Sequence, residues 1–398
     1  MTETSASLPD LPTARTCPYQ PPEGQRRLRE SGPVVRVRLP DGRPAWLVTG
    51  YEQARSLLAD QRLTADRTHP NSPMPIPVPV TRHAQVSGLR PMLLGFEGQE
   101  HNRQRKMLTS AFTVKRVAAL RPRLQRIVDE HLDRMIAAGP PADLVSSFAL
   151  PVPSLAICEL LGVPYADHAF FERQARLRHD PGRAPEALTE LGDYLQRLVQ
   201  AKRSDLGDGL LDELLARQVR HGTLDQAELV GFALVLLIAG HATTAGMISY
   251  GTLALLEHPD QLAILRGDGR RLPDMVEELL RFVSLDFGTL PRVATTDIEI
   301  AGLRIDAGDG VLIAIGAANR DETLVERPDE LDLRRVGTTH LAFSHGIHQC
   351  LGQHLARAEL QIALSALFGR LPNLRLNGPA DRLTTTPGAG LDVLPVAW

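Results

Sequence analysis

The stretch that decides the fold is Phe343-Ser344-His345-Gly346-Ile347-His348-Gln349-Cys350-Leu351-Gly352. Behind it, apolar residues recur at helical spacing as far as Gly369, at Leu351, Leu355, Ala358, Ile362 and Ala366. Cys350 therefore lies where a glycine-containing loop enters a helix, and there backbone N–H groups and the helix dipole favour a thiolate. Gly346 and Gly352 lack a Cβ, so a flat group can approach the backbone closely. We interpret Cys350 as a candidate metal ligand.

The spacing Phe-x-x-Gly-x-His-x-Cys-x-Gly resembles the haem-thiolate loop of the cytochrome P450 family. The resemblance implies haem b as the cofactor and Cys350 as the ligand of its iron. It also places Phe343, His348 and Gly352 in contact with the haem. The alternative for a single Cys is a buried, inert side chain.

Charge and cysteine content exclude several classes of protein. Lys and Arg total 44 against 47 Asp and Glu in 398 residues, a net charge of −3, so we predict no nucleic-acid partner and no anionic-membrane partner. The three cysteines are far apart and odd in number, which argues against a disulfide framework and fits a reducing cytoplasm. The length allows two or three average domains or one large one.

Two segments were tested for membrane insertion. Residues 1–12 are polar and acidic with no apolar core, so we expect neither a signal peptide nor an anchor there. Residues 229–256 carry no charge and are long enough to cross a bilayer, but polar groups interrupt them and a basic flank is missing. We predict a buried helix, no membrane partner and a cytoplasmic location.

The helix of residues 229–256 is expected to be long. It begins at a capping box over residues 223–226 and is stopped by Pro259, which gives a length of about 50 Å through the centre of the fold. Within it, residues 239–244 resemble the oxygen-activating motif of the family, Ala-Gly-x-acid-Thr-Thr. The resemblance implies that Ala239 and Gly240 leave room for dioxygen and that Thr243 takes part in proton delivery. Alternatively, the threonines bond back to preceding carbonyls and the glycine serves packing.

One position departs from this motif, because Ala242 stands where the family has an acid. The acid normally relays protons from solvent. A water chain or His241 is our hypothesis for a substitute.

Other residues acquire roles through the same resemblance. His101 and Arg105 share one face of a helix that opens at residue 97, and the family uses such a pair for the haem propionates. Arg292 and His340 are expected to contact the propionates too. An ordinary solvated helix face is the alternative for the first pair.

A buried structural pair is expected at Glu278 and Arg281, which match the Glu-x-x-Arg motif of the family. A third arginine usually joins them from a Pro-x-Arg-Phe stretch. Here residues 328–331 read Pro-Asp-Glu-Leu, so Glu330 occupies the place of that arginine.

The remaining pattern predicts the architecture. We expect a hairpin (34–39 and 46–49), helices at 51–60, 117–137, 144–161, 164–178 and 185–202 and from 273, strands at 298–300, 303–305 and 311–315, and one last strand within 391–396. Residues 71–94 read as a long loop and 179–182 as a joint, in the region that forms the lid in the family. The resemblance spans the chain and implies a single, mainly α domain (1–398) with a small β-rich lobe, an extended segment at 1–20, and a long central helix over the haem. Residues 16–19, 32–34 and 318–321 make it most similar to soluble actinomycete members.

The expected function is that of a monooxygenase, which inserts one oxygen atom from O2 into a mainly apolar small molecule, by hydroxylation or epoxidation. A Gly-x-Gly-x-x-Gly fingerprint is absent from the sequence, so electrons are expected from an external ferredoxin and its reductase. Arg103, Lys106 and Arg357 are candidates for docking an acidic ferredoxin, with solvated charges as the alternative. Candidate substrate contacts are Ile76, Val78, Leu89, Leu236, Ala239, Leu285, Phe287 and Leu391. A macrolide, a terpenoid, a steroid-like and a drug-like molecule all fit them.

Three alternatives stay open: a peroxygenase that uses hydrogen peroxide, an oxidative coupling or nitrating enzyme of a biosynthetic pathway, and a non-enzymatic binder of haem or ligand. The missing acid at Ala242 favours the peroxygenase. The presence of Thr243 and Gly240 argues against it and against the binder.

Overall fold

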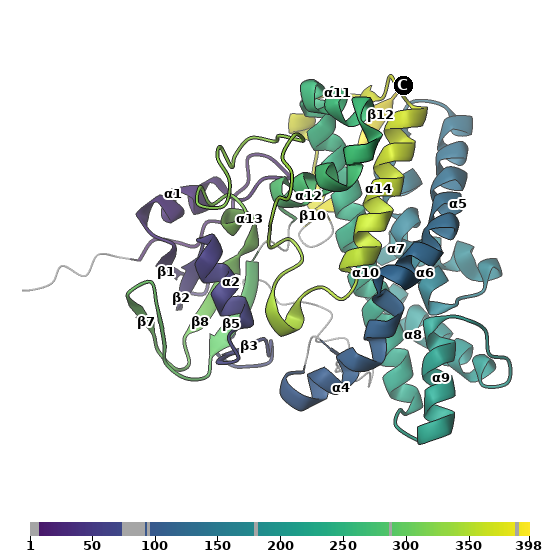
Figure 1. Ribbon diagram of the computed structural model, residues 1–398, viewed down its shortest axis with the longest axis horizontal. Helices are drawn as coiled ribbons and strands as arrows, with labels where there is room; N and C mark the ends of the chain where they lie inside the picture. Colours follow the sequence, from purple (N-terminus) through teal and green to yellow (C-terminus); the bar gives the residue numbers. More distant parts are fainter. Residues whose placement is uncertain (1–7, 74–91, 94–95, 179–181, 286–288, 387–389) are drawn as a thin grey trace, which may run out of the picture. The chain divides into compact units, whose positions relative to one another are not determined.

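The computed structural model describes residues 8–73, 92–93, 96–178, 182–285, 289–386 and 390–398 (Figure 1). The chain forms two compact units. Unit 1 comprises Met1–Pro77, Glu277–Asp332 and Gly337–Cys350, and unit 2 comprises Val78–Val276, Leu333–Val336 and Leu351–Trp398. Unit 1 holds most of the strands and unit 2 most of the helices, which agrees with a β-rich lobe and a helical part. That the two make a single domain stays a prediction.

Unit 1 is built on short elements. Its helices are α1 (Glu23–Ser31), α2 (Tyr51–Ala59) and α13 (Ile315–Ala318), with the 3-10 turn η5 (Gly346–His348), and α12 (Leu272–Phe282) runs into it from unit 2. Its strands are β1 (Val34–Arg38), β2 (Pro44–Val48), β3 (Leu63–Thr64), β5 (Thr289–Ala294), β6 (Ile298–Ile300), β7 (Leu303–Ile305) and β8 (Gly310–Ala314).

The main sheet of unit 1 has the strand order β1–β2–β8–β5–β3. The predicted hairpin is confirmed: β1 and β2 pair antiparallel with Val34 opposite Val48, and Gly42 turns the chain at φ +84°. β2 pairs with β8 in parallel, and β8 pairs with β5 antiparallel. β6 and β7 form the predicted second hairpin.

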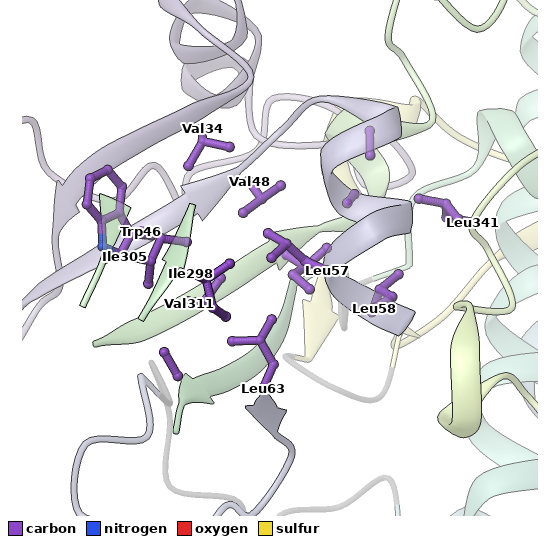
Figure 2. Close-up of a cluster of buried hydrophobic side chains, with 14 of the residues drawn as sticks. Val34, Trp46, Val48, Leu57, Leu58, Leu63, Ile298, Ile305, Val311 and Leu341 are labelled. Atoms are coloured by element: carbon purple, nitrogen blue, oxygen red, sulfur yellow. The ribbon is translucent and has the colours of Figure 1, made fainter. Parts of the chain in front are cut away.

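One face of this sheet is covered by α2. Leu57 and Leu58 of α2 share a buried apolar cluster with Val311 of β8 and Leu341, which precedes the cysteine loop (Figure 2). Each of these side chains is almost wholly removed from water, which stabilises the packing by roughly 1.5–3 kcal/mol per residue. The start of the cysteine loop is therefore fixed to the sheet through α2.

Unit 2 is mostly helical. Its helices are α4 (Gly98–Thr109), α5 (Val114–Ala138), α6 (Pro151–Leu161), α7 (His168–Arg178), α8 (Ala184–Lys202), α9 (Leu210–His221), α10 (Gln226–Glu257), α11 (Pro259–Gly267) and α14 (Gln353–Arg370). Single turns are η1 (Ser110–Phe112), η2 (Val145–Ala149), η3 (Tyr165–Asp167), η4 (Gly269–Arg271) and η6 (Ala380–Arg382). Short strands are β4 (Ala142–Asp143), β9 (Arg375–Leu376), β10 (Thr385–Thr386), β11 (Gly390–Leu391) and β12 (Pro395–Ala397).

The long helix α10 packs against α6, α8 and α14 of the same unit. It passes a length and composition test for a membrane span, but 61% of its most apolar window is buried inside the protein, as the prediction of a buried helix requires. Its capping box differs from the predicted one. Asp225 is the N-cap and accepts from the Glu228 N–H at 2.8 Å, while the Glu228 carboxylate accepts from the Asp225 N–H at 3.0 Å.

Several expectations need correction. Helices α9 and α11 were not predicted, and α14 begins at Gln353 rather than Leu351. The single strand expected within 391–396 is two short strands, β11 and β12. The chain between them turns aside because the N–H of Asp392 donates to Thr384 and that of Leu394 to the Asp143 carboxylate.

We predict that Asp225→Ala lowers the free energy of unfolding by about 1 kcal/mol, because the first turn of α10 loses its side-chain acceptor. Urea denaturation followed by circular dichroism measures the change. Asp205→Ala is the control, since this acid is exposed in the α8–α9 loop. Equal effects of the two substitutions would contradict a capping role.

Candidate active site

The cysteine loop of unit 1 closes on itself through backbone hydrogen bonds. The Cys350 N–H donates to the Phe343 carbonyl at 2.9 Å, and the Ser344 N–H donates to the Leu341 carbonyl at 2.7 Å. Cys350 is half-buried and forms no disulfide. The loop thus presents an unoxidised, partly accessible sulfur on a constrained backbone, three residues before α14 begins.

Gly346 is required by the packing of this loop. Its φ is +73°, a region that side chains disfavour. A Cβ there would clash with the Leu58 carbonyl oxygen and would lie 2.9 Å from the Cα of Ala59, both at the end of α2. Any other residue would push the loop away from α2.

The side chains around Cys350 fit a metal ion whose other ligands come from a cofactor and not from the protein. Within the residues that the structure describes, no group of three or more His, Cys, Asp or Glu side chains is placed to hold a metal ion. A structural zinc ion needs about four protein ligands, whereas a haem iron is held in the macrocycle and takes one thiolate from the protein. The loop therefore suits a haem.

Glu278 and Arg281 form a fully buried ion pair at the end of α12, with both side chains 0% exposed. Arg281 donates to both carboxylate oxygens of Glu278 at 2.8 Å. Its other N–H groups donate to the carbonyls of Asn319 (3.0 Å), Pro328 (2.7 Å) and Glu330 (3.1 Å). All five donors of the guanidinium are thus used. The predicted pair is present, and it joins three segments of the chain: the end of α12, Asn319 and residues 328–330.

Glu330, at the position where a third arginine is expected, contributes to the ion pair in a different way. Glu330 serves the pair through its backbone carbonyl, and its side chain forms an exposed ion pair with Arg327 at 2.7 Å. The second buried guanidinium beside the pair belongs to Arg320, which lies 4.2 Å from the Phe282 ring and donates to the Phe282 carbonyl. Burial, and next the charge of Arg281, lower the pKa of Arg320 to about 10. In the sequence, Arg320 only supports the resemblance to the family, and its burial beside the ion pair is not predicted.

Arg292 and His340, the two residues of unit 1 expected to bind the propionates, make different contacts. Arg292 lies on β5, is 8% exposed and donates to the Pro291 carbonyl at 2.8 Å. His340 has protein partners at both ring nitrogens: Nδ1 accepts from the Ala342 N–H at 3.2 Å, so Nε2 carries the proton and donates to Glu277 at 3.1 Å. This geometry indicates that His340 holds the start of the cysteine loop, and its contact with a propionate stays a prediction.

In unit 2, α4 carries His101 and Arg105 four residues apart, as predicted. His101 is buried, and burial, followed by the charge of Arg105, lowers its pKa and favours the neutral ring. Arg103 on the same helix is held by the carboxylates of Glu100 and Glu228. These carboxylates offset its charge, which weakens Arg103 as a candidate for docking an acidic protein, and its role there stays a prediction. Lys106 is exposed, and Arg357 on α14 donates to Gln353 at 3.0 Å.

Away from its two ends, α10 is least covered in its middle. Ala239 is exposed, and Gly240, Ala242 and Thr243 are half-buried. The Thr243 hydroxyl donates to the Ala239 carbonyl at 2.9 Å, which leaves its oxygen lone pairs available as acceptors. The helix thus presents small side chains and one hydroxyl.

His241 does not belong to that face of α10. Its ring is buried, and Nε2 lies 3.1 Å from the Leu150 carbonyl, to which it donates. Residues two apart on a helix point in different directions, so His241 faces away from Thr243. The hypothesis that His241 relays protons is not supported by this geometry.

A protein-family model also matches more than half of the chain. The family model described as Cytochrome P450 matches residues 170–268 and 270–378. The chain belongs to the cytochrome P450 family. P450 enzymes are haem monooxygenases that bind haem b through a thiolate, so the protein is an oxidoreductase with that cofactor.

Similar P450s come from actinomycetes. The chain is 54% identical to pentalenic acid synthase of Streptomyces avermitilis over 100% of both chains. It is 46% identical to vitamin D3 dihydroxylase of Streptomyces griseolus, over 100% of this chain and 98% of the other. The crystal structure of CYP105D6 matches with a TM-score of 0.89 and 49% identity over 99% of each chain. The P450 fold and the actinomycete type, both predicted, are confirmed.

The structure describes only some of the expected substrate contacts of this P450. Ile76, Val78, Leu89 and Phe287 lie outside the described residues. Leu236 and Leu391 are buried, at 8% and 2% exposure, and Leu285 is half-buried. The structure brings Leu391 near α10, because β11 packs on this helix: a Cβ on Gly390 would lie 3.7 Å from the Cα of Gly246.

We predict that Gly240→Ala does not destabilise the protein and raises the free energy of unfolding by up to about 1 kcal/mol. A Cβ at Gly240 would lie 3.5 Å from Ile157, an ordinary van der Waals contact. Chemical denaturation measures the change, with Gly251→Ala on the same helix as the control, since a Cβ there meets nothing within 4 Å. A loss of stability at residue 240 alone would show that this glycine serves helix packing.

Proposed function

We propose that this P450 hydroxylates a mainly apolar small molecule with electrons from a ferredoxin and its reductase. The observation that carries the proposal is the cysteine loop: a half-buried, unoxidised Cys350 on a backbone closed by hydrogen bonds and by the contact of Gly346 with α2. Hydroxylation is supported by the name of the relative from Streptomyces griseolus, a dihydroxylase.

Cys350 is the proposed ligand of the haem iron. When bound, a thiolate-ligated haem supplies the activation of O2 for insertion into C–H bonds. Phe343 and Gly352 flank the ligand in sequence. His101, Arg105, Arg292 and His340 are proposed to hold the propionates, because guanidinium and imidazole N–H groups donate to carboxylates, and His348 is proposed as a further haem contact.

Thr243 is the proposed proton-handling group on α10. Its hydroxyl proton bonds to the Ala239 carbonyl, and its lone pairs can accept from a water molecule. Since Ala242 brings no acid and His241 is turned toward Leu150, we assign the delivery of protons to water that reaches the uncovered stretch around Ala239.

The substrate is proposed to contact Leu236, Ala239, Leu285 and Leu391, together with Ile76, Val78, Leu89 and Phe287. Mostly apolar side chains select for a molecule with a large apolar surface. The relatives named for pentalenic acid and vitamin D3 support this class. Lys106 and Arg357 stay as candidates for the ferredoxin surface, and a cytoplasmic location stays a prediction.

We predict that the reduced protein with carbon monoxide has a strongly red-shifted Soret band and that Cys350→Ala lacks it, because the substitution removes the thiolate. Absorption spectra of the purified proteins measure this. Cys17→Ser is the control, as Cys17 is also a half-buried cysteine of unit 1 that forms no disulfide. A parent band typical of histidine-ligated haem would refute the assignment of Cys350.

A peroxygenase is the second candidate, and Ala242 in place of an acid is the observation that favours it. Turnover with ferredoxin and reductase, compared with turnover on hydrogen peroxide alone, separates the two. The monooxygenase requires the first to exceed the second.

We predict that Ala242→Glu lowers the share of reducing equivalents lost as hydrogen peroxide, because a carboxyl group next to Thr243 relays protons. Peroxide release and product formation per NADPH measure the coupling. Ala242→Gln has the same size without the acid and is expected to leave the coupling as in the parent. Unchanged coupling in the glutamate variant would mean that the missing acid is irrelevant.

A further inference from the structure

The short segment Ala318–Asp321 of unit 1 makes contacts that lead to the cysteine loop by two routes. Asn319 is 2% exposed and Arg320 1% exposed, so the segment runs through the interior of the unit. Asn319 reaches the residue that precedes the loop, and Asp321 reaches the helix on which the loop rests. Neither contact was predicted from the sequence.

The first route passes through the side chain of Asn319. Its Oδ1 accepts from the Leu341 N–H at 2.7 Å, and its backbone carbonyl accepts from Arg281 at 3.0 Å. The Leu341 carbonyl then accepts from the Ser344 N–H at 2.7 Å, and the Phe343 carbonyl accepts from the Cys350 N–H at 2.9 Å. One residue, Asn319, thus links the buried Glu278–Arg281 pair to the backbone that carries Cys350, through its backbone carbonyl on one side and its side-chain oxygen on the other.

The second route passes through α2. Gly50, its N-cap, has no side chain, and the Asp321 carboxylate supplies the missing acceptor by bonding to the Tyr51 N–H at 2.7 Å. Burial would raise the pKa of Asp321, but the N–H groups of Tyr51 and Thr323 hold it below its usual value, so the acceptor is charged. The far end of α2 contacts Gly346 in the cysteine loop.

The two routes meet in one apolar cluster. Leu341, bonded to Asn319, packs with Leu57 and Leu58 of α2 (Figure 2). The loop is therefore fixed at its start by a hydrogen bond and in its middle by the end of a helix, and both constraints originate within three residues of the chain.

We infer that Asn319 is a positioning residue for the Cys350 thiolate, acting through its side-chain oxygen on Leu341, and that Asp321 supports the same loop through α2. The inference rests on the proposed function, because it assigns the geometry of the ligand loop and not its chemistry. Without the Asn319 oxygen, the Leu341 N–H has no acceptor in the apolar cluster, and the loop moves to find one. A displaced sulfur would hold a thiolate bond to the iron less firmly.

The test uses Asn319→Leu, which keeps the branching at Cγ and removes the acceptor, and Asn319→Asp, which keeps the acceptor. Gln261→Met is the matched control: the Gln261 side-chain oxygen accepts from the Leu333 N–H at 2.9 Å, also buried, but in unit 2. The readout is the lifetime of the red-shifted band of the reduced carbon monoxide complex, with urea stability measured in parallel.

We expect Asn319→Leu to shorten the lifetime of that band at least about tenfold, the scale of one unsatisfied buried donor. Asn319→Asp is expected to restore it. Gln261→Met is expected to lose stability and to keep the lifetime of the parent. An unchanged lifetime in Asn319→Leu, or an equal loss in Gln261→Met, would overturn the inference.

Asp321→Ala tests the second route. It also provides the test of the inference if Asn319→Leu does not fold. Asp297→Ala is its control, because Asp297 also accepts from a backbone N–H of unit 1, that of Ala307 at 2.9 Å, in the β6–β7 region. A shortened lifetime in Asp321→Ala alone supports the inference, and equal lifetimes overturn it. A parent without the red-shifted band would instead refute the proposed function, so the two failures are distinguishable.

Discussion

The interaction on which much of unit 1 depends is the buried ion pair of Glu278 and Arg281. Removing two charges from water costs several kcal/mol for each ion, and their attraction repays this only when every hydrogen-bonding group is satisfied. Here the five donors of the guanidinium all find acceptors, three of them backbone carbonyls near residues 319 and 328–330. Those segments cannot move without leaving a buried charge unpaired, so the pair fixes the frame on which the cysteine loop is built.

In unit 2, the central constraint is the composition of α10. Most of its residues are buried, and a buried helix gains from large apolar side chains, yet Ala239, Gly240, Ala242 and Thr243 are small and partly uncovered. Packing within the unit does not explain this stretch, because a Cβ at Gly240 would be accommodated next to Ile157. Small residues in such a place are expected when the helix must leave room for something other than protein.

Local patterns made parts of this structure predictable. The β1–β2 hairpin follows from a turn sequence between two β-prone runs, and the long helix follows from its apolar composition and Pro259. The Glu278–Arg281 spacing is local in the same sense. The predicted capping box was misplaced by two residues, because Thr223 and Asp225 both fit an N-cap pattern and only backbone geometry selects Asp225. The pattern does not predict α9 and α11, and α11 begins at Pro259 itself, the residue that ends the predicted long helix.

By itself, the sequence determined the family, the cysteine loop, the candidate hydroxyl Thr243 and the order of most elements, since each depends on neighbours in the chain. Only the tertiary structure decided which acceptors the buried donors use. Glu330 contributes a carbonyl instead of a side chain, His340 is bound to Glu277, His241 is turned toward Leu150, and Asn319 bonds to Leu341. These partners are distant in sequence, and the requirement that buried polar groups be satisfied selects them only after the chain has folded.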